Sequence, residues 1–236
     1  MSTYVLVHGA WHSGRAWDRV VPLLTAAGHE VFAPSLTGHG DTAGLMRPGV
    51  GLDTYVEDLA RLFTGRGLAE VVLVGHSFAG MIISSVANRM PERVAHLVYL
   101  DAMDPTDGQA ALDVAPAAQS LIDEAAASDA PWRLPPLPPA FFGVTEPADV
   151  AWLHTILTDE PAQIFQQPAK LGNPAAETIP ATYIRCVDHR SVPGAPQPVP
   201  GTRPNGGPVR VWELESGHDC MITTPSGLAE ILLKIT

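Results

Sequence analysis

The stretch Val71-Val-Leu-Val-Gly-His-Ser-Phe-Ala-Gly80 joins a short apolar run to a serine flanked by small residues. Valine and leucine fill its first four places, which favours a buried strand, and the apolar residues that follow up to Met90 recur at helical spacing. No formally charged residue occurs between Val71 and Asn88. Because the polar turn interrupts this stretch, a strand, a sharp turn and a helix are a better interpretation than a membrane-spanning helix.

Ser77 occupies the turn between this strand and this helix. A serine in such a strained turn projects its hydroxyl above the sheet, and small residues two places away on either side let the turn close. Those places hold Gly75 and Ala79, where the usual pattern has glycine in both. Because an ordinary capping serine gives a similar short pattern, the motif makes Ser77 a candidate nucleophile that needs support from the rest of the chain.

Short apolar runs followed by helical patterns recur along the chain, which is typical of a parallel sheet covered by helices on both faces. Several runs are continuously apolar, as expected for strands buried on both faces. The sequence therefore predicts an α/β fold with about six strands in a mostly parallel sheet. The predicted strands are Thr3–Val7, Glu30–Ala33, Val71–Val74, His96–Leu100, Thr182–Val187 and Val209–Leu214. Helices are predicted around 20–27, 53–64, 78–90 and 226–234.

The alternation of strands and helices breaks in the middle of the chain. The irregular stretch is far longer than a crossover helix requires, and it is rich in alanine, proline and aromatic residues. We interpret residues 104–180 as an inserted helical cap over the carboxyl ends of the strands, where open α/β sheets bind ligands. Residues 1–103 and 181–236 would then form the core, which includes a proline-rich loop at 193–208.

The composition is that of a globular protein without a strongly basic surface. The 236 residues include 14 Lys+Arg and 25 Asp+Glu, a formal net charge of −11, with 46% hydrophobic and 17% charged residues. This balance excludes intrinsic disorder and argues against a nucleic-acid or anionic-membrane partner, since both require a cationic surface. The chain starts without the basic and long apolar segments of a signal peptide. Since Cys186 and Cys220 are expected to be buried free thiols, we predict a cytoplasmic location.

Two further segments bring chemically useful groups toward the serine turn. The first strand ends in His8-Gly-Ala-Trp11, a loop that can offer a backbone N–H as half of an oxyanion hole, with the N–H of Phe78 as the other half. The last strand leads to His218, on a loop before the closing helix. A serine followed by a histidine near the C-terminus is one of the known orders of a catalytic triad.

The remaining histidines and glycines do not indicate a metal ion or a cofactor. His8 and His12 have a spacing found in zinc sites, but no acidic third ligand lies nearby in the sequence. The glycine spacing of the serine motif matches a phosphate-binding loop, yet Met81 and Ile82 replace the lysine and the serine or threonine that such a loop requires. We therefore predict that the protein works without a metal ion or an organic cofactor.

Three motifs define a combined pattern: His8-Gly-Ala-Trp-His-Ser-Gly-Arg-Ala-Trp17, Gly75-His-Ser-Phe-Ala-Gly80 and Ser216-Gly-His-Asp-Cys-Met221. Together they resemble the esterase and hydroxynitrile-lyase branch of the α/β-hydrolases, which includes the plant methylesterases and many bacterial relatives. The resemblance runs from Thr3 to Ala102 and again from Thr182 to the end of the chain. It implies an α/β-hydrolase fold and an oxyanion hole made by the amides of Ala10 and Phe78.

The acid of the triad is where this sequence departs from that family. The plant enzymes carry it after the strand that matches Thr182–Val187, but His189 stands there and Asp188 lies one residue earlier. A one-residue shift at a strand end turns a side chain to the other face. Asp101 ends the preceding strand, where haloalkane dehalogenases, which share the fold, can carry the acid. We predict Asp101 and keep Asp188 and Asp104 as alternatives, because any strand end that reaches Nδ1 of the histidine can supply the carboxylate.

The leading hypothesis is a cofactor-independent serine hydrolase that cleaves a carboxylic ester through an acyl-enzyme. Ser77 would attack the carbonyl, His218 would transfer the proton, and Asp101 would orient His218. We expect a small or medium-sized apolar ester, such as a methyl ester or a lactone, as the partner, and the sequence leaves a homodimer open. The candidate pocket residues are Trp11, Phe78, Met103, Trp132, Phe141, Phe142, Trp152 and Met221.

Two other functions are compatible with the same fold. Plant hydroxynitrile lyases carry a threonine beside the oxyanion loop and a lysine after the histidine, where this chain has Gly9 and Asp219. An anion beside His218 would oppose developing cyanide, which disfavours the lyase. A ligand-binding protein without turnover would keep the fold but would not require both Ser77 and His218.

Overall fold

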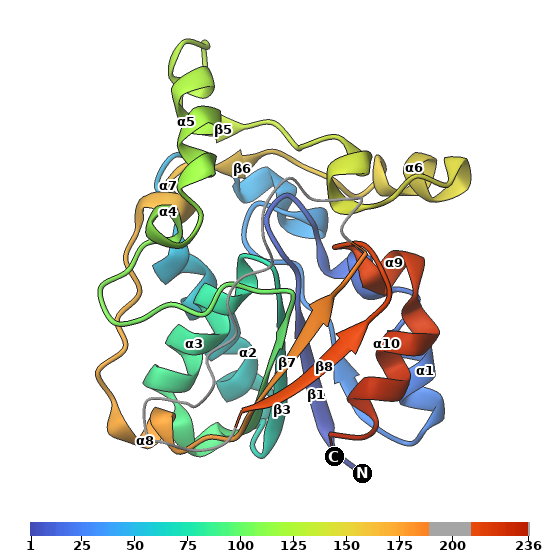
Figure 1. Ribbon diagram of the computed structural model, residues 1–236. Helices are drawn as coiled ribbons and strands as arrows, with labels where there is room; N and C mark the ends of the chain where they lie inside the picture. Colours follow the sequence, from blue (N-terminus) through green and yellow to red (C-terminus); the bar gives the residue numbers. More distant parts are fainter. Residues whose placement is uncertain (189–208, 236) are drawn as a thin grey trace.

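The computed structural model describes residues 1–188 and 209–235, whose centre is one large sheet. Its strands are β1 (Thr3–Val7), β2 (Glu30–Phe32), β3 (Val71–His76), β4 (Val94–Leu100), β7 (Ala181–Cys186) and β8 (Arg210–Leu214). They lie in the order β2-β1-β3-β4-β7-β8, and every neighbouring pair is parallel (Figure 1). The six-stranded α/β fold predicted from the sequence is confirmed.

Helices cover both faces of this sheet. The core helices are α1 (Val21–Ala26), α2 (Leu52–Arg66), α3 (Ala79–Arg89), α9 (Cys220–Thr223) and α10 (Pro225–Leu232), with the short 3₁₀ turns η1 (Gly14–Trp17), η2 (Gly40–Leu45) and η3 (Pro91–Arg93). Helices α2 and α3 pack together on one side of the sheet, and α1 packs against α10 on the other (Figure 1). The central strand β3 is buried along its whole length, so its unbroken apolar run follows from its place between two layers of helices.

The helix boundaries have local causes. Helix α2 ends at Gly67, whose φ of 64° lies in the left-handed region that glycine adopts without strain. Helix α3 ends before Pro91, because the residue ahead of a proline disfavours helical geometry. One face of α2 is buried, and Tyr55, Leu59 and Phe63 lie on it. The helical spacing read from the sequence therefore matches the face that the core covers.

Residues 104–180, which we call the upper segment, contain only short elements. These are α4 (Ala111–Val114), η4 (Pro116–Ala118), α5 (Gln119–Ala126), β5 (Arg133–Leu134), η5 (Pro139–Phe142), α6 (Pro147–Leu153), β6 (Glu160–Pro161), α7 (Gln163–Gln166) and α8 (Pro174–Glu177). Strands β5 and β6 form a small antiparallel pair. Figure 1 shows much of this segment crossing above the carboxyl ends of the large sheet, with α5 projecting farthest and both chain termini at the opposite end.

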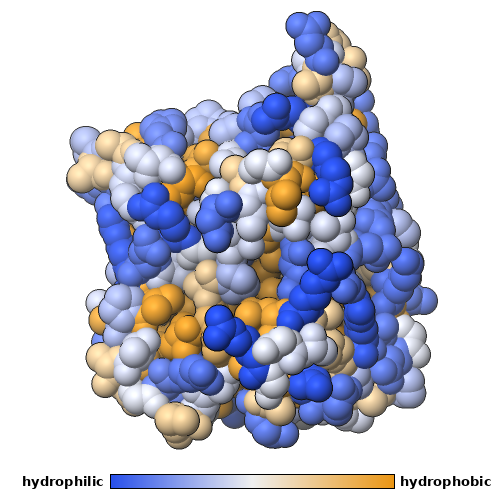
Figure 2. Space-filling view, turned by 180° about the vertical axis from the view of Figure 1, so that it is seen from behind, coloured by the Kyte–Doolittle hydropathy of each residue, from blue (hydrophilic) through white to orange (hydrophobic). Residues whose placement is uncertain are grey.

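The distribution of hydrophobic residues on the surface and the burial of the cysteines agree with a sheet covered by helices. Seen from behind, apolar residues gather in the middle of the face and hydrophilic residues dominate its edges (Figure 2). Cys186 and Cys220 are buried free thiols, as predicted. No helix among residues 1–188 and 209–235 is both long and apolar enough to cross a bilayer. The predicted proline-rich loop at 193–208 lies outside the described residues.

Candidate active site at the carboxyl ends of the strands

Ser77 lies in a tight turn between β3 and α3. Its φ angle of 57° falls in the left-handed region that residues other than glycine rarely adopt. A Cβ atom on Gly75 would lie 2.8 Å from the carbonyl oxygen of Ala79, and one on Gly9 would lie 2.9 Å from the Cβ of Ser77. Glycine is therefore required at both places, since a side chain would prevent the turn from closing beside the end of β1.

Asp101 occupies a similar turn at the end of the neighbouring strand, with a φ of 44°. The pairing of His76 with Leu100 across β3 and β4 brings the two turns side by side. The amide of Ser77 donates to the carbonyl of Leu100 at 3.1 Å, and the amide of Met103 donates to the carbonyl of Ser77 at 3.0 Å. The sheet thus holds two strained residues, each costing roughly 1–3 kcal/mol, in one hydrogen-bonded unit.

The carboxylate of Asp101 meets the imidazole of His218. Its Oδ2 lies 2.6 Å from Nδ1 of His218, and its Oδ1 accepts from the backbone N–H of Cys186 at 3.3 Å. Because a carboxylate only accepts, Nδ1 carries the proton when the imidazole is neutral, and Nε2 is then the basic nitrogen. This is the tautomer that a histidine needs in order to take a proton from a serine.

The other two candidate acids make hydrogen bonds of their own. The hydroxyl of Tyr183 donates to the carboxylate of Asp104. The backbone amide of Asp188 donates to the carbonyl of Ser216 at 3.0 Å, so Asp188 lies at the end of β7 next to the loop that carries the histidine. The Asp101 carboxylate, by comparison, contacts Nδ1 of His218 directly.

His76, the residue before Ser77, supports the histidine loop. Its Nε2–H donates to the carbonyl oxygen of His218 at 3.0 Å, and the two rings lie 4.6 Å apart. Burial, and then the nearby rings of His218 and His12, hold the pKa of His76 well below its usual 6.5. His76 therefore stays neutral and ties the loop after β8 to the end of β3.

The loop after β1 lies against the serine turn through Gly9. Its next residue, Ala10, is one of the two predicted oxyanion-hole donors, and the residue after that, Trp11, has a φ of 65°. The other predicted donor is the amide of Phe78, which directly follows Ser77 at the start of α3. Both predicted amides therefore belong to backbone that contacts or continues the Ser77 turn.

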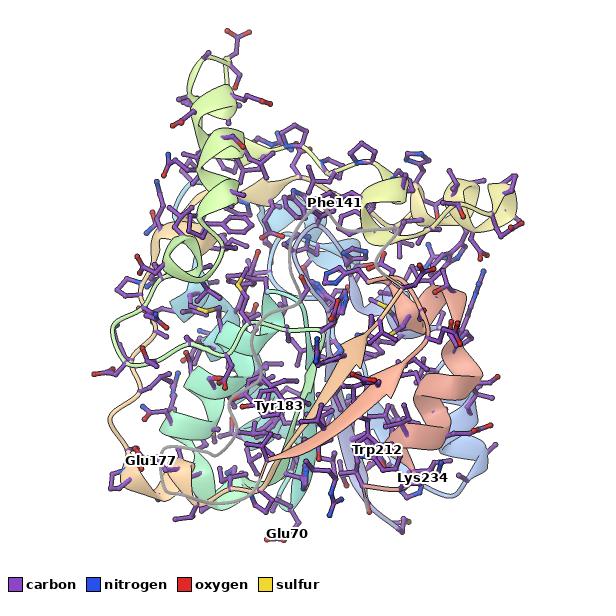
Figure 3. The ribbon with its side chains drawn as sticks, viewed as in Figure 1. Glu70, Phe141, Glu177, Tyr183, Trp212 and Lys234 are labelled. Atoms are coloured by element: carbon purple, nitrogen blue, oxygen red, sulfur yellow. The ribbon has the colours of Figure 1, made fainter. Side chains whose placement is uncertain are left out.

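One predicted pocket residue, Phe142, packs against His218, and two others pack against Phe142. The ring of Phe142 is stacked with the His218 imidazole at 6.4 Å and lies 6.2 Å from the ring of Trp11. Phe141 packs edge-on against Phe142 at 5.4 Å, and Figure 3 labels it in the segment above the sheet. Met221, three residues after His218, is fully buried. The three aromatic rings therefore form one packed group that reaches His218 through Phe142.

Other predicted pocket residues have different surroundings. Trp132 lies under the guanidinium group of Arg133 at 5.4 Å, and Trp152 lies under that of Arg19 at 5.3 Å. Arg19 also forms an ion pair with Asp149 at 2.6 Å. The structure therefore places Trp152 in a cation–π contact between α6 and the core. Met103 is half-buried and bonded through its amide to the serine turn.

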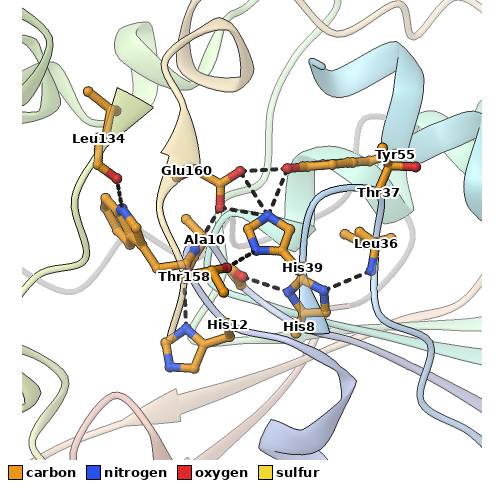
Figure 4. Close-up of polar contacts among 12 residues, drawn as sticks. His8, Ala10, His12, Leu36, Thr37, His39, Tyr55, Leu134, Thr158 and Glu160 are labelled. Atoms are coloured by element: carbon orange, nitrogen blue, oxygen red, sulfur yellow. Dashed lines mark hydrogen bonds and ion pairs between the residues drawn. The ribbon is translucent and has the colours of Figure 1, made fainter. Parts of the chain in front are cut away.

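The structure contains a buried polar cluster beside the loop after β1 that was not predicted from the sequence. Glu160 in β6, His39 and Tyr55 are each 1% exposed or less, and their polar atoms face one another (Figure 4). Glu160 stands more than a hundred residues from both partners, so no spacing could have linked them. Its local sequence, Thr158-Asp-Glu-Pro161, is polar and gives no sign that Glu160 is buried.

A family model described as the alpha/beta hydrolase family matches residues 4–231. The chain belongs to the alpha/beta hydrolase family. The carbendazim hydrolyzing esterase of Nocardioides sp. (strain SG-4G) is 34% identical over 188 residues, which cover 79% of this chain and 69% of that protein. The pyrethroid hydrolase of Sphingobium wenxiniae is 31% identical over 245 residues, which cover 97% of this α/β-hydrolase and 85% of that protein.

A solved structure is similar to this α/β-hydrolase over almost its whole length. It is an extracellular alpha/beta-hydrolase from a Paenibacillus species, described as sharing structural and functional homology with tobacco salicylic acid binding protein 2. The TM-score is 0.85 at 26% identity, covering 99% of this chain and 98% of that one. The resemblance to the esterase branch that the three sequence motifs indicated is confirmed.

Proposed function

We propose that this α/β-hydrolase is a serine esterase that cleaves carboxylic esters, with Ser77 as nucleophile, His218 as general base and acid, and Asp101 as the orienting carboxylate. The observation that carries the proposal is the 2.6 Å contact between Asp101 Oδ2 and His218 Nδ1, at strand ends next to a serine turn with a φ of 57°. The similarity to a carbendazim hydrolyzing esterase and a pyrethroid hydrolase supports the same class of reaction.

In this mechanism, His218 Nε2 takes the hydroxyl proton as Ser77 Oγ attacks the ester carbonyl, and a tetrahedral oxyanion forms. The amides of Ala10 and Phe78 donate to that oxyanion. The carbon–oxygen bond to the alcohol then breaks, and His218 returns the proton to the leaving alcohol. Water attacks the acyl-enzyme by the same route, which releases the acid and restores Ser77.

The surroundings of His218 favour an apolar ester of small or medium size, such as a methyl ester or a lactone. Phe142 is stacked with the imidazole, and Trp11 and Phe141 pack against Phe142. Aromatic walls with few polar groups bind apolar molecules and leave orientation to a small number of hydrogen bonds. In this proposal the upper segment acts as the cap, since Phe141 and Phe142 both belong to it.

The proposal is tested with a panel of chromogenic esters of increasing acyl length and a fluorophosphonate probe for reactive serines. We expect turnover and labelling in the wild type, and a loss on the order of 10⁶-fold in kcat for Ser77→Ala and for His218→Ala. Since the two residues act as a unit, the double variant should be scarcely slower than either single variant.

Ser85→Ala is the matched control. Ser85 lies two turns farther along the same helix and donates its hydroxyl to the carbonyl of Met81, so its removal leaves the serine turn untouched. Two results would contradict Ser77 as the nucleophile. One is near-normal turnover by Ser77→Ala, and the other is probe labelling that is lost in Ser85→Ala but kept in Ser77→Ala.

A further inference from the structure

One peptide group in the loop after β1 is held at both ends by buried side chains. The carbonyl oxygen of Ala10 accepts from His12 Nδ1 at 2.7 Å, and the N–H of Trp11 donates to Glu160 Oε2 at 2.6 Å. These two backbone atoms belong to the same planar peptide unit. His12 and Glu160 are each 1% exposed. The peptide that follows Ala10 is therefore fixed from two sides, away from water.

The hydrogen-bond partners of His12 define its charge. Nδ1 faces a carbonyl oxygen, and Nε2 lies 2.9 Å from Oδ2 of the buried Asp219. Both partners only accept, so both ring nitrogens carry protons and His12 is an imidazolium. Burial alone would lower the pKa of His12, but the charge and hydrogen bond of Asp219, with the Ala10 carbonyl, outweigh it and raise the pKa.

Glu160 reaches the same peptide from the upper segment. Besides the Trp11 amide, its carboxylate accepts from the hydroxyl of Tyr55 at 2.6 Å and lies 3.3 Å from Nε2 of His39 (Figure 4). Burial, and then the charge of Glu160, raise the pKa of Tyr55, so the phenol stays a donor. A second contact reinforces this attachment, because the amide of Thr158 donates to the carbonyl of Trp11 at 2.9 Å.

The preceding peptide group, between Gly9 and Ala10, is oriented by its carbonyl. The oxygen of Gly9 accepts from Nδ1–H of His8 at 2.9 Å and from the amide of His12 at 3.4 Å. Nε2 of His8 accepts from the amide of Leu36 at 3.1 Å, so His8 is neutral, and burial keeps its pKa well below 6.5. In a trans peptide the N–H points opposite the carbonyl. Fixing the Gly9 oxygen therefore fixes the direction of the Ala10 N–H.

We propose that Glu160 and His12 are positioning residues, which clamp the Ala10–Trp11 peptide and so hold the Ala10 amide in place as an oxyanion donor. This inference rests on the proposed serine esterase function. Its physical basis is that donors stabilise an oxyanion only if they are aimed before the charge develops. The clamp joins the cap to the loop, because Glu160 belongs to β6.

The test compares Glu160→Ala, Glu160→Gln and His12→Gln in the full chain. Losing an oxyanion donor costs about 10²–10³ in kcat, so a misaimed donor should cost about 10–100-fold for Glu160→Ala, with KM within about threefold. Glu160→Gln keeps a carbonyl that can accept from the Trp11 amide and should recover most of that loss. His12→Gln acts on the opposite end of the same peptide and should give the same kinetic pattern.

A pair of inhibitors separates positioning from general structure. A trifluoromethyl ketone binds as a hemiketal oxyanion on Ser77, whereas the matching methyl ketone binds without forming that charge in quantity. The affinity of Glu160→Ala for the fluorinated ketone should fall by the same factor as kcat, while its affinity for the methyl ketone stays unchanged. Asp159→Ala is the control, since Asp159 adjoins Glu160 but pairs with Arg133 at 2.9 Å.

The inference is overturned if folded Glu160→Ala and His12→Gln keep kcat and fluorinated-ketone affinity within twofold of the wild type. It is also overturned if KM rises while kcat is kept and both ketones weaken equally, because Glu160 would then shape the pocket. Should Glu160→Ala fail to fold, His12→Gln decides by the same two criteria. A wild type without ester turnover and without Ser77 labelling would instead refute the esterase function itself.

Discussion

The sheet core and the upper segment both reach the candidate site, but they do so by different means. The core supplies Ser77, Asp101 and His218 from strand ends, and backbone hydrogen bonds of the sheet fix the first two. The upper segment contributes side chains that reach toward the core, namely Glu160 at the first loop and Phe142 at His218. Its longest helix, α5, has 8 residues. Backbone hydrogen bonds of the sheet therefore position Ser77 and Asp101 of the candidate triad, whereas side chains of the irregular segment form part of its surroundings.

We expect the largest effect, a loss of kcat, from a substitution of the core residue Asp101. Asp101→Asn replaces the carboxylate by a neutral amide whose NH2 can donate to Nδ1 and favour the other tautomer of His218, so kcat should fall on the order of 10⁴-fold while the fold is kept. The measurement is ester turnover together with the melting temperature. Asp188→Asn is the matched control at the next strand end and should retain most activity. A collapse of turnover in Asp188→Asn with Asp101→Asn unaffected would reverse the assignment.

The next effect concerns stability and compares two glycines. A Cβ on Gly80 in α3 would lie 1.8 Å from the carbonyl oxygen of Met103, which is backbone and cannot move aside. Gly80→Ala should therefore destabilise the protein by about 3 kcal/mol, at the upper end of typical overpacking costs. Gly172 in the upper segment is exposed, and a Cβ there meets nothing within 4 Å.

Chemical denaturation of both variants measures this contrast. Gly172→Ala should leave the free energy of unfolding within about 0.5 kcal/mol of the wild type, as for most surface substitutions. Equal losses in the two variants would show that the upper segment is as tightly constrained as the core, and the comparison drawn above would fail.

The smallest expected effect is a change of selectivity in the upper segment. Phe141→Ala removes a ring that packs on Phe142 and should shift kcat/KM between short and long acyl esters by about 10-fold, the scale of one or two methylenes in an apolar pocket. Trp152→Ala is the control, because its ring packs under Arg19. Fluorophosphonate labelling of Ser77 should survive in both. Loss of labelling and fold together would make these aromatics structural core.

The sequence predicted the core well because its signals are local. Strand β1 has the predicted bounds, and the serine motif spans a strand, a turn and a helix as expected. Strand β4 starts two residues earlier than predicted, at Val94, because pairing with Val71 extends it. Asp101 was predicted among three acids because it lies at a strand end. Its contact with His218, however, depends on the order of the strands in the sheet, and local sequence patterns do not give that order.

The upper segment and the clamp could not be predicted in the same way. Helices of four residues, such as α4 and α7, are too short to show a period in the sequence. The hydrogen bond between Glu160 and the amide of Trp11 spans 149 positions in the sequence. Its donor is a backbone N–H, which every residue except proline has, so the residue type at position 11 does not indicate the bond. His12 was visible as a histidine near His8, but its charge depends on Asp219, 207 positions away.

The bond between Glu160 and Trp11 has a consequence for recombination among relatives. A chimaera that took residues 104–180 from another family member would keep the whole core, including Ser77, Asp101 and His218. It would lose the acceptor of the Trp11 amide unless the incoming segment carried a carboxylate or amide side chain where Glu160 stands. If the proposed esterase mechanism holds, residues 104–180 influence both substrate range and oxyanion geometry, and an exchanged segment should transfer its specificity intact only when it is matched to the loop after β1.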